Sequence, residues 1–239
     1  KVKHLGILRL PKRSTLSYAN SHRPWQLYEK VFYQLYSQAA ALADKKKRRF
    51  RFKNPLYSLD SSVIDLCLSL YDWARFRRAK GAIKLHLMLN HQGCLPCWAL
   101  ITDGKTHDVK VAQNLSFTPD TIVVMDRGYV DYAFFQRQTT DGVWFVTRSK
   151  QNMQYRVVKN HTLPKQSIVR KDQEIVLTGY MAKRSCSCRL RRLVVWNAEH
   201  EREIILLTNH MVFAASTVSK IYKDLWQIKL FLKRRSSGV

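Results

Sequence analysis

The feature that most constrains the fold is the run Ile122–Met125, four apolar residues that end on Asp126 and are followed at once by Arg-Gly-Tyr. A short apolar run bounded by turn-forming residues is typical of a strand buried on both faces of a sheet. The carboxylate at its end either starts a turn or stands at the edge of a sheet, where α/β proteins bind their ligands.

The surrounding patterns predict several further elements. Pro24 is placed to open a helix over residues 25–43. Its apolar residues recur at helical spacing and predict a buried stripe of Trp25, Tyr28, Val31, Phe32, Leu35, Tyr36 and Ala39. Strands are expected at 54–60, 82–90, 95–102, 121–126, 143–148 and 204–209, and helices at 109–115, 131–139 and 216–235. The segment 149–203 contains short β-like pieces and no clear helix. This order predicts an α/β fold with a mixed sheet.

The charge of the chain points to a polyanionic partner. Lys and Arg number 42 against 17 Asp and Glu, a net charge of +25. Such an excess is typical of proteins that bind nucleic acid and, less often, of proteins that bind anionic membranes. No apolar stretch approaches the roughly 20 residues that span a bilayer, and no signal peptide is evident. We therefore expect a cytoplasmic protein without a membrane partner. The block "KKKRRFRFK" at 45–53 is either a solvated linker or a nucleic-acid contact, and its interleaved phenylalanines and the net charge leave the two readings evenly balanced.

The cysteines indicate neither a disulfide framework nor a metal site. Five cysteines are an odd count for a framework and suit a reducing compartment. The motif "CLPC", Cys94 to Cys97, has the spacing of redox and zinc motifs, but it lies between two strand-like runs. The pair Cys186 and Cys188 is too far along the chain to favour a shared zinc site. We interpret Cys94 and Cys97 as two residues of a β-hairpin.

Two aspartates carry the most chemical information. Asp60 and Asp126 each terminate an expected strand, so neighbouring strands could bring them together. Carboxylate pairs of this kind bind Mg²⁺ or Mn²⁺, and such ions assist phosphodiester cleavage. Alternatively, Asp60 caps a helix over "SSVIDL" and Asp126 only starts a turn.

Several longer motifs resemble one family. The segments "LYSLDSSVIDLCLSLYDWARFRRAKGAIKLH", "ITDGKTHDV", "VVMDRGYVDY" and "LLTNH…IYKDLWQIKLFLK" are similar to the DDE transposases of bacterial insertion sequences. They resemble in particular the fourth numbered family, whose last motif is spelled Tyr-Arg-Glu-Lys.

The resemblance implies an α/β RNase H-like catalytic core with a β-rich insertion, and the motifs divide the chain into four parts. They are a basic helical segment at 1–53, the first part of the core at 54–148, the insertion at 149–203, and the last core strand and helix at 204–235. It also implies cut-and-paste transposition that depends on Mg²⁺ or Mn²⁺. The DNA partners would be the double-stranded transposon ends and the double-stranded target. A second copy of the chain, as a homo-oligomer, and a bacterial, nucleoid-associated location are further implications. Asp60 and Asp126 match the first two catalytic acids and metal ligands.

The third acid is where the sequence departs from the family. The motif falls on Tyr222, Leu225, Lys229 and Ser236, so a leucine replaces the arginine and a lysine replaces the metal-binding glutamate. We therefore expect a transposase copy with impaired catalysis or, as the alternative, a DNA-binding remnant. A basic RNA-binding structural protein is a third reading, which the strand-end aspartates oppose.

Other basic and aromatic residues in these motifs are expected to contact DNA. They are Arg127, Tyr129, Tyr222, Lys80, Lys84, Arg148 and Lys150. His86, His107 and Asp108 also lie in matching segments, but we leave them outside the catalytic set because a lone histidine on a strand is more often structural.

Overall fold

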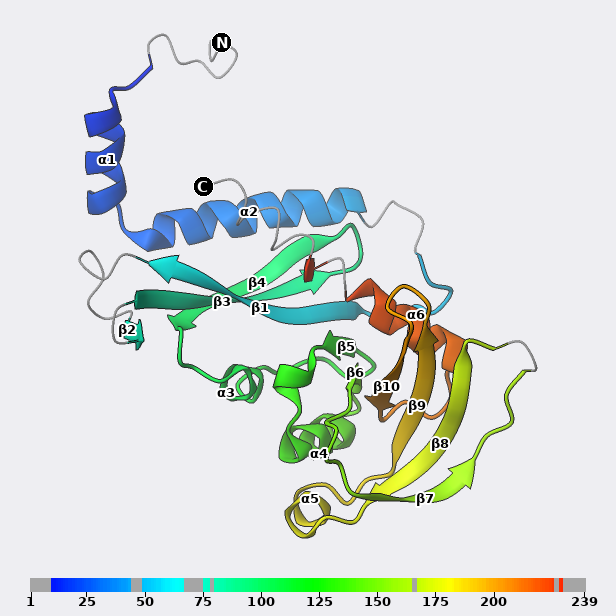
Figure 1. Ribbon diagram of the computed structural model, residues 1–239. Helices are drawn as coiled ribbons and strands as arrows, with labels where there is room; N and C mark the ends of the chain where they lie inside the picture. Colours follow the sequence, from blue (N-terminus) through cyan, green and yellow to red (C-terminus); the bar gives the residue numbers. More distant parts are fainter. Residues whose placement is uncertain are drawn as a thin grey trace.

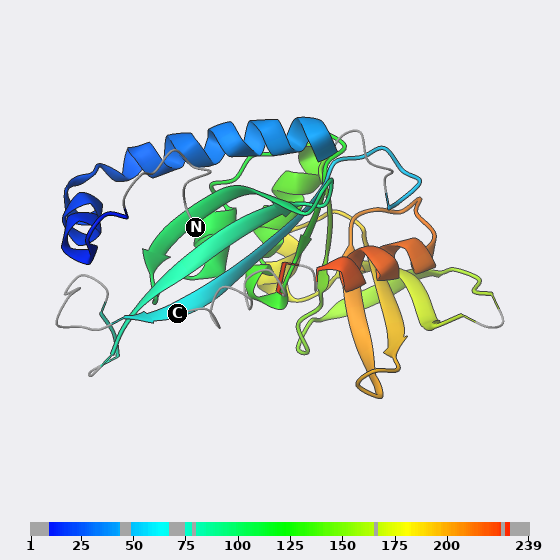
Figure 2. The same ribbon diagram turned by 90° about the horizontal axis from the view of Figure 1, so that it is seen from above.

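A computed structural model describes residues 10–43, 49–66, 75–77, 80–164, 167–225 and 228–229 (Figures 1 and 2). The helices in this part of the chain are α1 (Arg13–His22), α2 (Trp25–Ala43), α3 (Asp108–Ala112), a 3₁₀ helix (Arg127–Tyr129), α4 (Tyr132–Thr140), α5 (Tyr180–Ser185) and α6 (Ala215–Asp224). The strands are β1 (Leu56–Leu66), β2 (Arg75–Arg77), β3 (Lys80–Asn90), β4 (Leu95–Asp103), β5 (Ile122–Met125), β6 (Trp144–Arg148), β7 (Tyr155–Asn160), β8 (Val169–Leu177), β9 (Leu190–Asn197) and β10 (Arg202–Thr208).

The described strands form one mixed sheet. Its order is β2-β3-β1-β5-β6-β10-β9-β8-β7, with β4 also paired to β3. Strands β1, β3 and β4 form an antiparallel meander, whereas β5 and β6 run parallel to β1. The core order β4-β3-β1-β5-β6 is that of an RNase H-like fold, so the prediction of an α/β mixed sheet is confirmed.

The first strand is longer than expected. The sequence predicted that it would close on Asp60, but β1 continues to Leu66 and Asp60 lies near its middle. The alternative of a helix capped by Asp60 is also wrong, because Ser61 to Leu66 pair with β3. Parallel pairing with β5 ends at Leu59 opposite Met125, so it is the short neighbour β5, rather than β1 itself, that ends beside Asp60.

Apolar side chains pack on both faces of the sheet. One cluster joins the strands to α6 through Val218, Ile221, Leu225 and Ile228. The other joins Leu59, Val123 and Met125 to the 3₁₀ helix and α4, where Phe135 stacks on Phe145 with ring centroids 4.1 Å apart. Burial on both faces explains why β5 reads as a continuous apolar run.

The segment 149–203 extends this sheet. Its strands β7, β8 and β9 continue from β10, which pairs with β6 of the core. In Figure 1 strand β8 runs from beside α6 at one end to beside α5 at the other, in agreement with its contacts to both helices. The expectation of no helix here is wrong, because α5 spans six residues between β8 and β9. This helix was hidden because it buries none of its residues fully and so shows no apolar stripe.

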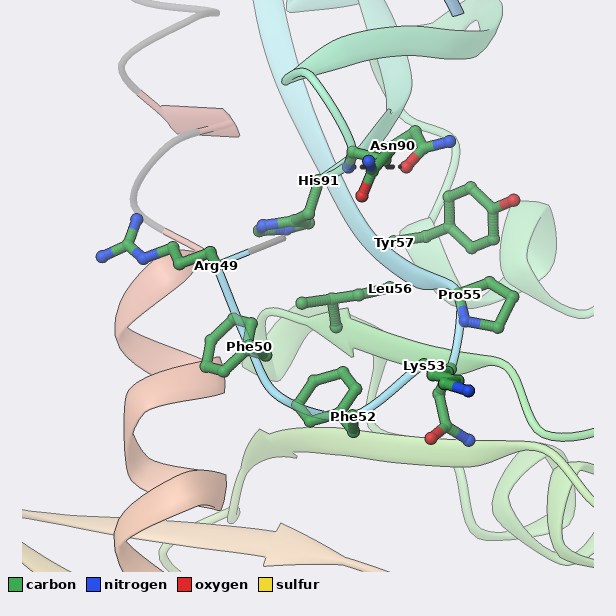
Figure 3. Close-up of a pocket in the computed structure, with 11 residues that line it drawn as sticks. Arg49, Phe50, Phe52, Lys53, Pro55, Leu56, Tyr57, Asn90 and His91 are labelled. Carbon is green, nitrogen blue, oxygen red and sulfur yellow. Dashed lines mark hydrogen bonds between the residues drawn. The ribbon is translucent and has the colours of Figure 1, made fainter. Parts of the chain in front are cut away.

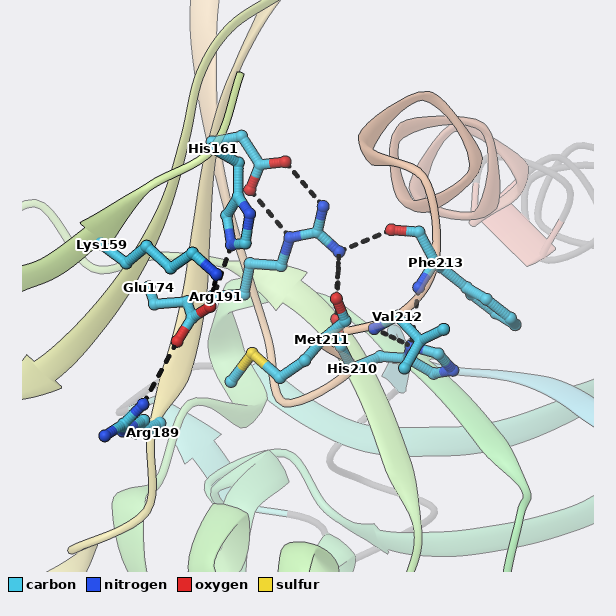
Figure 4. Close-up of polar contacts among 10 residues, drawn as sticks. Lys159, His161, Glu174, Arg189, Arg191, His210, Met211, Val212 and Phe213 are labelled. Carbon is cyan, nitrogen blue, oxygen red and sulfur yellow. Dashed lines mark hydrogen bonds and ion pairs between the residues drawn. The ribbon is translucent and has the colours of Figure 1, made fainter. Parts of the chain in front are cut away.

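A buried ion pair ties the outer strands to the chain before α6 (Figure 4). Arg191 of β9 donates to both carboxylate oxygens of Asp172 on β8, at 2.8 and 2.6 Å. Its remaining guanidinium nitrogen donates to the backbone carbonyls of His210, Met211 and Phe213. The pair therefore fixes the path by which the chain enters α6.

The expected buried stripe of α2 is only partly present. Phe32, Tyr36 and Ala39 are half-buried, and α2 contacts β4. The other predicted members are exposed, with Trp25 at 65% exposure, followed by Leu35, Val31 and Tyr28. Figure 2 shows α2 lying along one side of the sheet, where a single strand cannot cover the whole apolar face of a long helix.

Replacing Asp172 with alanine is expected to destabilise the fold by about 3–5 kcal/mol, because it leaves the Arg191 guanidinium buried without its counter-charge. Urea unfolding measures the change. Lys159→Ala is the control, since Lys159 is 62% exposed in its ion pair with Glu174 and its loss should cost under about 1 kcal/mol. Equal effects of the two substitutions would contradict the role assigned to the Arg191–Asp172 pair.

Candidate active site

The two predicted acids lie side by side at the end of β5. Leu59 of β1 is in register with Met125 of β5, so Asp60 and Asp126 follow at the same level of two adjacent strands. Asp60 is only 8% exposed. Asp126 begins the 3₁₀ helix, where its Oδ1 accepts a hydrogen bond of 2.6 Å from the Arg127 N–H. Asp126 therefore does start a turn, while its second carboxylate oxygen faces the site.

Lys229 occupies the third position of the site. Its Nζ donates to Oδ2 of Asp126 at 2.9 Å. The ion pair is partly exposed, with side-chain exposures of 36% for Lys229 and 34% for Asp126. The lysine that the sequence analysis singled out thus lies against Asp126 and brings an ammonium group to this carboxylate.

The two carboxylates have opposite pKa shifts. Burial raises the pKa of Asp60 to about 6, with the negative charges of Asp126 and Asp108 adding to the effect and Lys229 opposing it. Burial alone would also raise the pKa of Asp126, but hydrogen bonds from Lys229 and from the Arg127 N–H outweigh it and hold that pKa below its ordinary value. The ammonium group therefore neutralises Asp126 more effectively than Asp60.

A third carboxylate, Asp108, lies beside Asp60 and was left out of the predicted site. Its Oδ1 accepts a hydrogen bond of 2.8 Å from Ser61 Oγ. Lys84 Nζ lies 3.4 Å and His86 Nδ1 3.6 Å from the same oxygen. The segment "THD" was the available signal, because it places Asp108 at the start of α3, next to the 3₁₀ helix.

Two neighbours complete this carboxylate network. A Cβ at Gly128 would stand 2.9 Å from Asp108 Oδ2, so any larger residue there would push the Asp108 carboxylate aside. His86 is fully buried, and this burial lowers its pKa. The charge of Asp108 opposes the shift and the charge of Lys84 adds to it. The lowered pKa favours a neutral, structural imidazole. His107 precedes α3 and is exposed.

The predicted DNA contacts fall into two groups. Arg127 and Lys150 are exposed near the site and available to a ligand. Tyr129 is 1% exposed, so its side chain is not available to DNA. Lys84 is engaged with the Thr106 carbonyl at 2.8 Å and with Asp108, which also makes it a poor contact. Lys80 begins β3, and its side chain lies outside the described residues.

The residues of α6 and its continuation separate into those that face the site and those that do not. Tyr222 is half-buried beside Arg148, and burial together with the charge of Asp126 raises the pKa of its hydroxyl. Leu225 is buried in the core, so an arginine at this position would not reach the site without disturbing the packing. Asp224 faces away and pairs with Arg49 at 3.0 Å. Residues 226–227 and 230–239 lie outside the described part of the chain.

The basic segment around residue 50 packs against the chain before α6 and against the end of α6. Phe50 stacks on Phe52, and Phe52 stacks on Phe213, with ring centroids 4.9 and 5.0 Å apart. Arg49 and Arg51 are exposed between and beside these rings. Figure 3 shows this segment lining a pocket of about 220 Å³ at the start of β1, together with Tyr57 and His91. Phe50 and Phe52 therefore anchor this basic segment against the core.

Comparison with known proteins shows the family to which the chain belongs. The sequence model for the transposase DDE domain matches residues 51–231, most of the chain. The chain belongs to the DDE transposase family. It is 24% identical, over 92% of its length, to a probable transposase for insertion sequence element IS5377 of Geobacillus stearothermophilus. It is 28% identical, over 93% of its length, to the putative transposase y4zB of Sinorhizobium fredii.

This DDE transposase domain spans about three fifths of the relatives it matches, 57% and 62% of their respective lengths. Among solved structures, it is similar to a piggyBac transposase in a synaptic complex with hairpin DNA, with 10% identity and a TM-score of 0.42 over 89% of this chain and 45% of that one. Among the described helices, none combines the length and the hydropathy needed to cross a bilayer.

The DDE transposase family generally uses divalent metal ions, and the residues present do not fit one. The described residues contain no group of three or more His, Cys, Asp or Glu side chains arranged to hold a metal ion. Asp60 and Asp126 provide two hard oxygen donors, but the Lys229 ammonium group already neutralises one of them. The four cysteines in the described part of the chain add no alternative site. Cys94 and Cys97 lie in the β3–β4 hairpin, as predicted.

The raised pKa of Asp60 gives a pH-dependent prediction. Its folded-state pKa of about 6 lies above the ordinary value near 3.9, so this group destabilises the fold increasingly as pH rises from about 4 to 6. Asp60→Asn removes this effect. The unfolding free energy of the variant, relative to the parent chain, is expected to increase by roughly 2–3 kcal/mol between pH 4 and pH 7.

Denaturant unfolding at several pH values measures this difference. Asp103→Asn is the matched control, because hydrogen bonds from Thr106 outweigh a slight burial effect and lower the pKa of exposed Asp103. Its substitution should therefore reduce stability, relative to the parent, as pH rises. If the unfolding free energies of Asp60→Asn and of the parent chain change with pH in the same way, the conclusion that burial raises the pKa of Asp60 is wrong.

Proposed function

We propose that this chain is the catalytic domain of an insertion-sequence transposase that binds DNA but has lost strand cleavage. The observation that carries the proposal is the hydrogen bond of 2.9 Å from Lys229 Nζ to Asp126 Oδ2. In the family the corresponding residue is a glutamate that binds the metal ion with the two aspartates. In this chain an ammonium group satisfies Asp126, so no divalent ion is needed to hold the acids together.

Electrostatics explains why this substitution abolishes metal binding. Two unit charges about 4 Å apart interact by roughly 1–4 kcal/mol near a protein surface, and a divalent cation doubles the repulsion. Mg²⁺ would have to displace Lys229 from Asp126 and then bind a second carboxylate, Asp60, whose pKa burial raises to about 6. We therefore assign the impairment to position 229 and not to the fold.

The spacing of the C-terminal motif supports the family whose signature is Tyr-Arg-Glu-Lys. Tyr222 and Lys229 both lie near Asp126: the charge of Asp126 raises the pKa of the Tyr222 hydroxyl, and Lys229 donates a hydrogen bond to the carboxylate. Leu225 is buried and departs from the signature, whereas Arg148 supplies a guanidinium group near Tyr222 and Asp126. A functional site can therefore be sought by changing position 229 alone.

Double-stranded DNA is the proposed partner. The net charge of +25 favours a polyanion, and exposed cations lie close to the acids at Arg127 and Lys150. The anchored segment with Arg49 and Arg51 adds to this basic surface. Phosphate contacts of this kind need no metal ion, so DNA binding survives the loss of the third acid.

Lys229→Glu is expected to restore Mn²⁺ binding and Mn²⁺-dependent nicking of supercoiled DNA. The substitution replaces a cation by a third carboxylate beside Asp60 and Asp126, so Mn²⁺ should raise the melting temperature of the variant and leave that of the parent unchanged. Adding Asp126→Ala should abolish both effects. Lys223→Glu, the same charge change at an exposed position of α6, is the control and should restore neither.

The opposite result is also informative. If the parent chain nicks DNA and Asp126→Ala abolishes that activity, another ligand completes the site and the proposed impairment is wrong.

Arg127→Ala is expected to weaken DNA binding by the parent chain without metal. One lost phosphate contact should reduce the slope of log affinity against log salt by about 1, with little change between DNA sequences. Fluorescence anisotropy with a labelled duplex measures it. The control is Arg184→Ala, because Arg184 is an exposed residue of α5 that is far along the chain from the acids. An equal loss of DNA affinity in both variants would contradict a DNA-binding surface centred on the acids.

A further inference from the structure

Two cysteines meet at the turn between α5 and β9. Cys186 ends α5 and Cys188 follows two residues later, and both are free thiols. In an extended segment, residues two apart point to the same side, and here the two Sγ atoms are 2.7 Å apart. Gln136 of α4 holds the turn in this conformation, since its side-chain oxygen accepts hydrogen bonds from the backbone N–H groups of Ser187 and Cys188 at 3.0 and 3.2 Å.

We propose that Cys186 and Cys188 form a redox-sensitive dithiol that a low-molecular-weight disulfide, such as oxidised glutathione, converts to an intrachain disulfide. This site is independent of the acids and of the proposed loss of cleavage. It requires no large movement, because the two sulfur atoms are already adjacent on one side of the turn.

The surroundings give the two thiols different roles. Cys188 is half-buried, whereas Cys186 is 1% exposed in the apolar cluster under α4. Either sulfur can donate the hydrogen bond between them. With the buried Cys186 thiol as the donor, this bond lowers the pKa of Cys188 to about 7 and raises that of Cys186. Thr139 Oγ1 also donates to Cys188 Sγ at 3.8 Å. Cys188 is therefore the attacking thiolate and Cys186 the resolving thiol.

The reaction balances with oxidised glutathione as the only oxidant. The Cys188 thiolate attacks one glutathione sulfur, forms a mixed disulfide and releases one glutathione thiolate. That thiolate takes the proton of Cys186, and the Cys186 sulfur attacks Cys188 Sγ and releases the second glutathione. Two protein S–H bonds are lost, one S–S bond forms, and one molecule of oxidised glutathione becomes two of glutathione.

The pair Cys94 and Cys97 provides an internal comparison. Its C-x-x-C spacing is the better-known redox signature, but burial raises the pKa of Cys97 to about 11. Its thiol donates to the Met88 carbonyl at 3.4 Å, inside the hairpin. Near neutral pH the Cys188 thiol therefore ionises more readily than the Cys97 thiol, because the pKa of Cys188 is lowered and that of Cys97 is raised. Cys188 should thus react faster than Cys97 in the folded chain.

Oxidation would act on the strand that anchors α6. The turn leads into β9, where Arg191 holds Asp172 and the carbonyls before α6. A disulfide at the start of this strand restrains the path by which β9 leaves α5. The site therefore gives the outer strands of the sheet a redox-dependent rigidity.

The test is oxidation of the folded chain in glutathione buffers of increasing oxidised fraction, followed by alkylation, trypsin digestion and mass spectrometry. Cleavage after Arg184 and Arg189 isolates both cysteines in one peptide, SCSCR. This peptide should lose two hydrogen atoms under conditions that leave the peptide with Cys94 and Cys97 fully alkylated. In urea, where the folded environments are lost, the two pairs should react at similar rates.

Single substitutions test the assigned roles. Cys186→Ser should accumulate glutathione on Cys188, because no resolving thiol remains. Cys188→Ser should leave Cys186 unmodified, because that thiol is buried. The proposal is overturned if Cys94 and Cys97 oxidise first in the folded chain, or if Cys186 is glutathionylated in Cys188→Ser as fast as Cys188 is in Cys186→Ser.

Discussion

The parallel pairing of β1 with β5 is the constraint on which the rest of the site depends. Its register sets Leu59 opposite Met125, and this alone brings Asp60 and Asp126 to one level of the sheet. A slip of one residue would turn Asp60 towards the other face and remove the pair. The apolar clusters on both faces hold the register, because Val123 and Val124 of β5 point into opposite clusters. Catalytic geometry in this fold is thus a by-product of core packing.

The second determinant is the path of α6, which has three supports. Its apolar face packs into the core through Val218 and Ile221. Arg191 fixes the chain before it, and Arg49 pairs with Asp224 near its end. These contacts come from three distant parts of the sequence, and together they direct Lys229 at Asp126. Lys229 therefore meets Asp126 because these three supports fix the path of the chain that carries it.

Much of this arrangement could be predicted from the sequence. Ile122–Met125 was recognisable because a strand buried on both faces must be apolar throughout, and position 229 because helical spacing from Tyr222 survives the substitution. The extent of β1 was not predictable, since "SSVIDL" has the polar start of a helix and only its pairing with β3 makes it a strand. Asp108 was named but left outside the catalytic set, because its contact with Ser61 joins segments that are distant in sequence. The exposed face of α2 was misjudged because periodicity identifies an apolar stripe but not what covers it.

The way the outer strands join the core has a consequence for how such a domain can change over time. The segment leaves the core after β6 and returns in β10, and the Ser149 N–H donates to the Ile205 carbonyl at 2.9 Å, so its entry and exit are adjacent. Closing a longer or shorter loop across so small a gap costs little conformational entropy. Length variation is therefore expected to accumulate at β7, the outermost strand, whereas β8 and β9 must remain because they carry Asp172 and Arg191. The segment between β6 and β10 can therefore vary in length at β7, but not at β8 and β9, whose ion pair fixes the chain before α6.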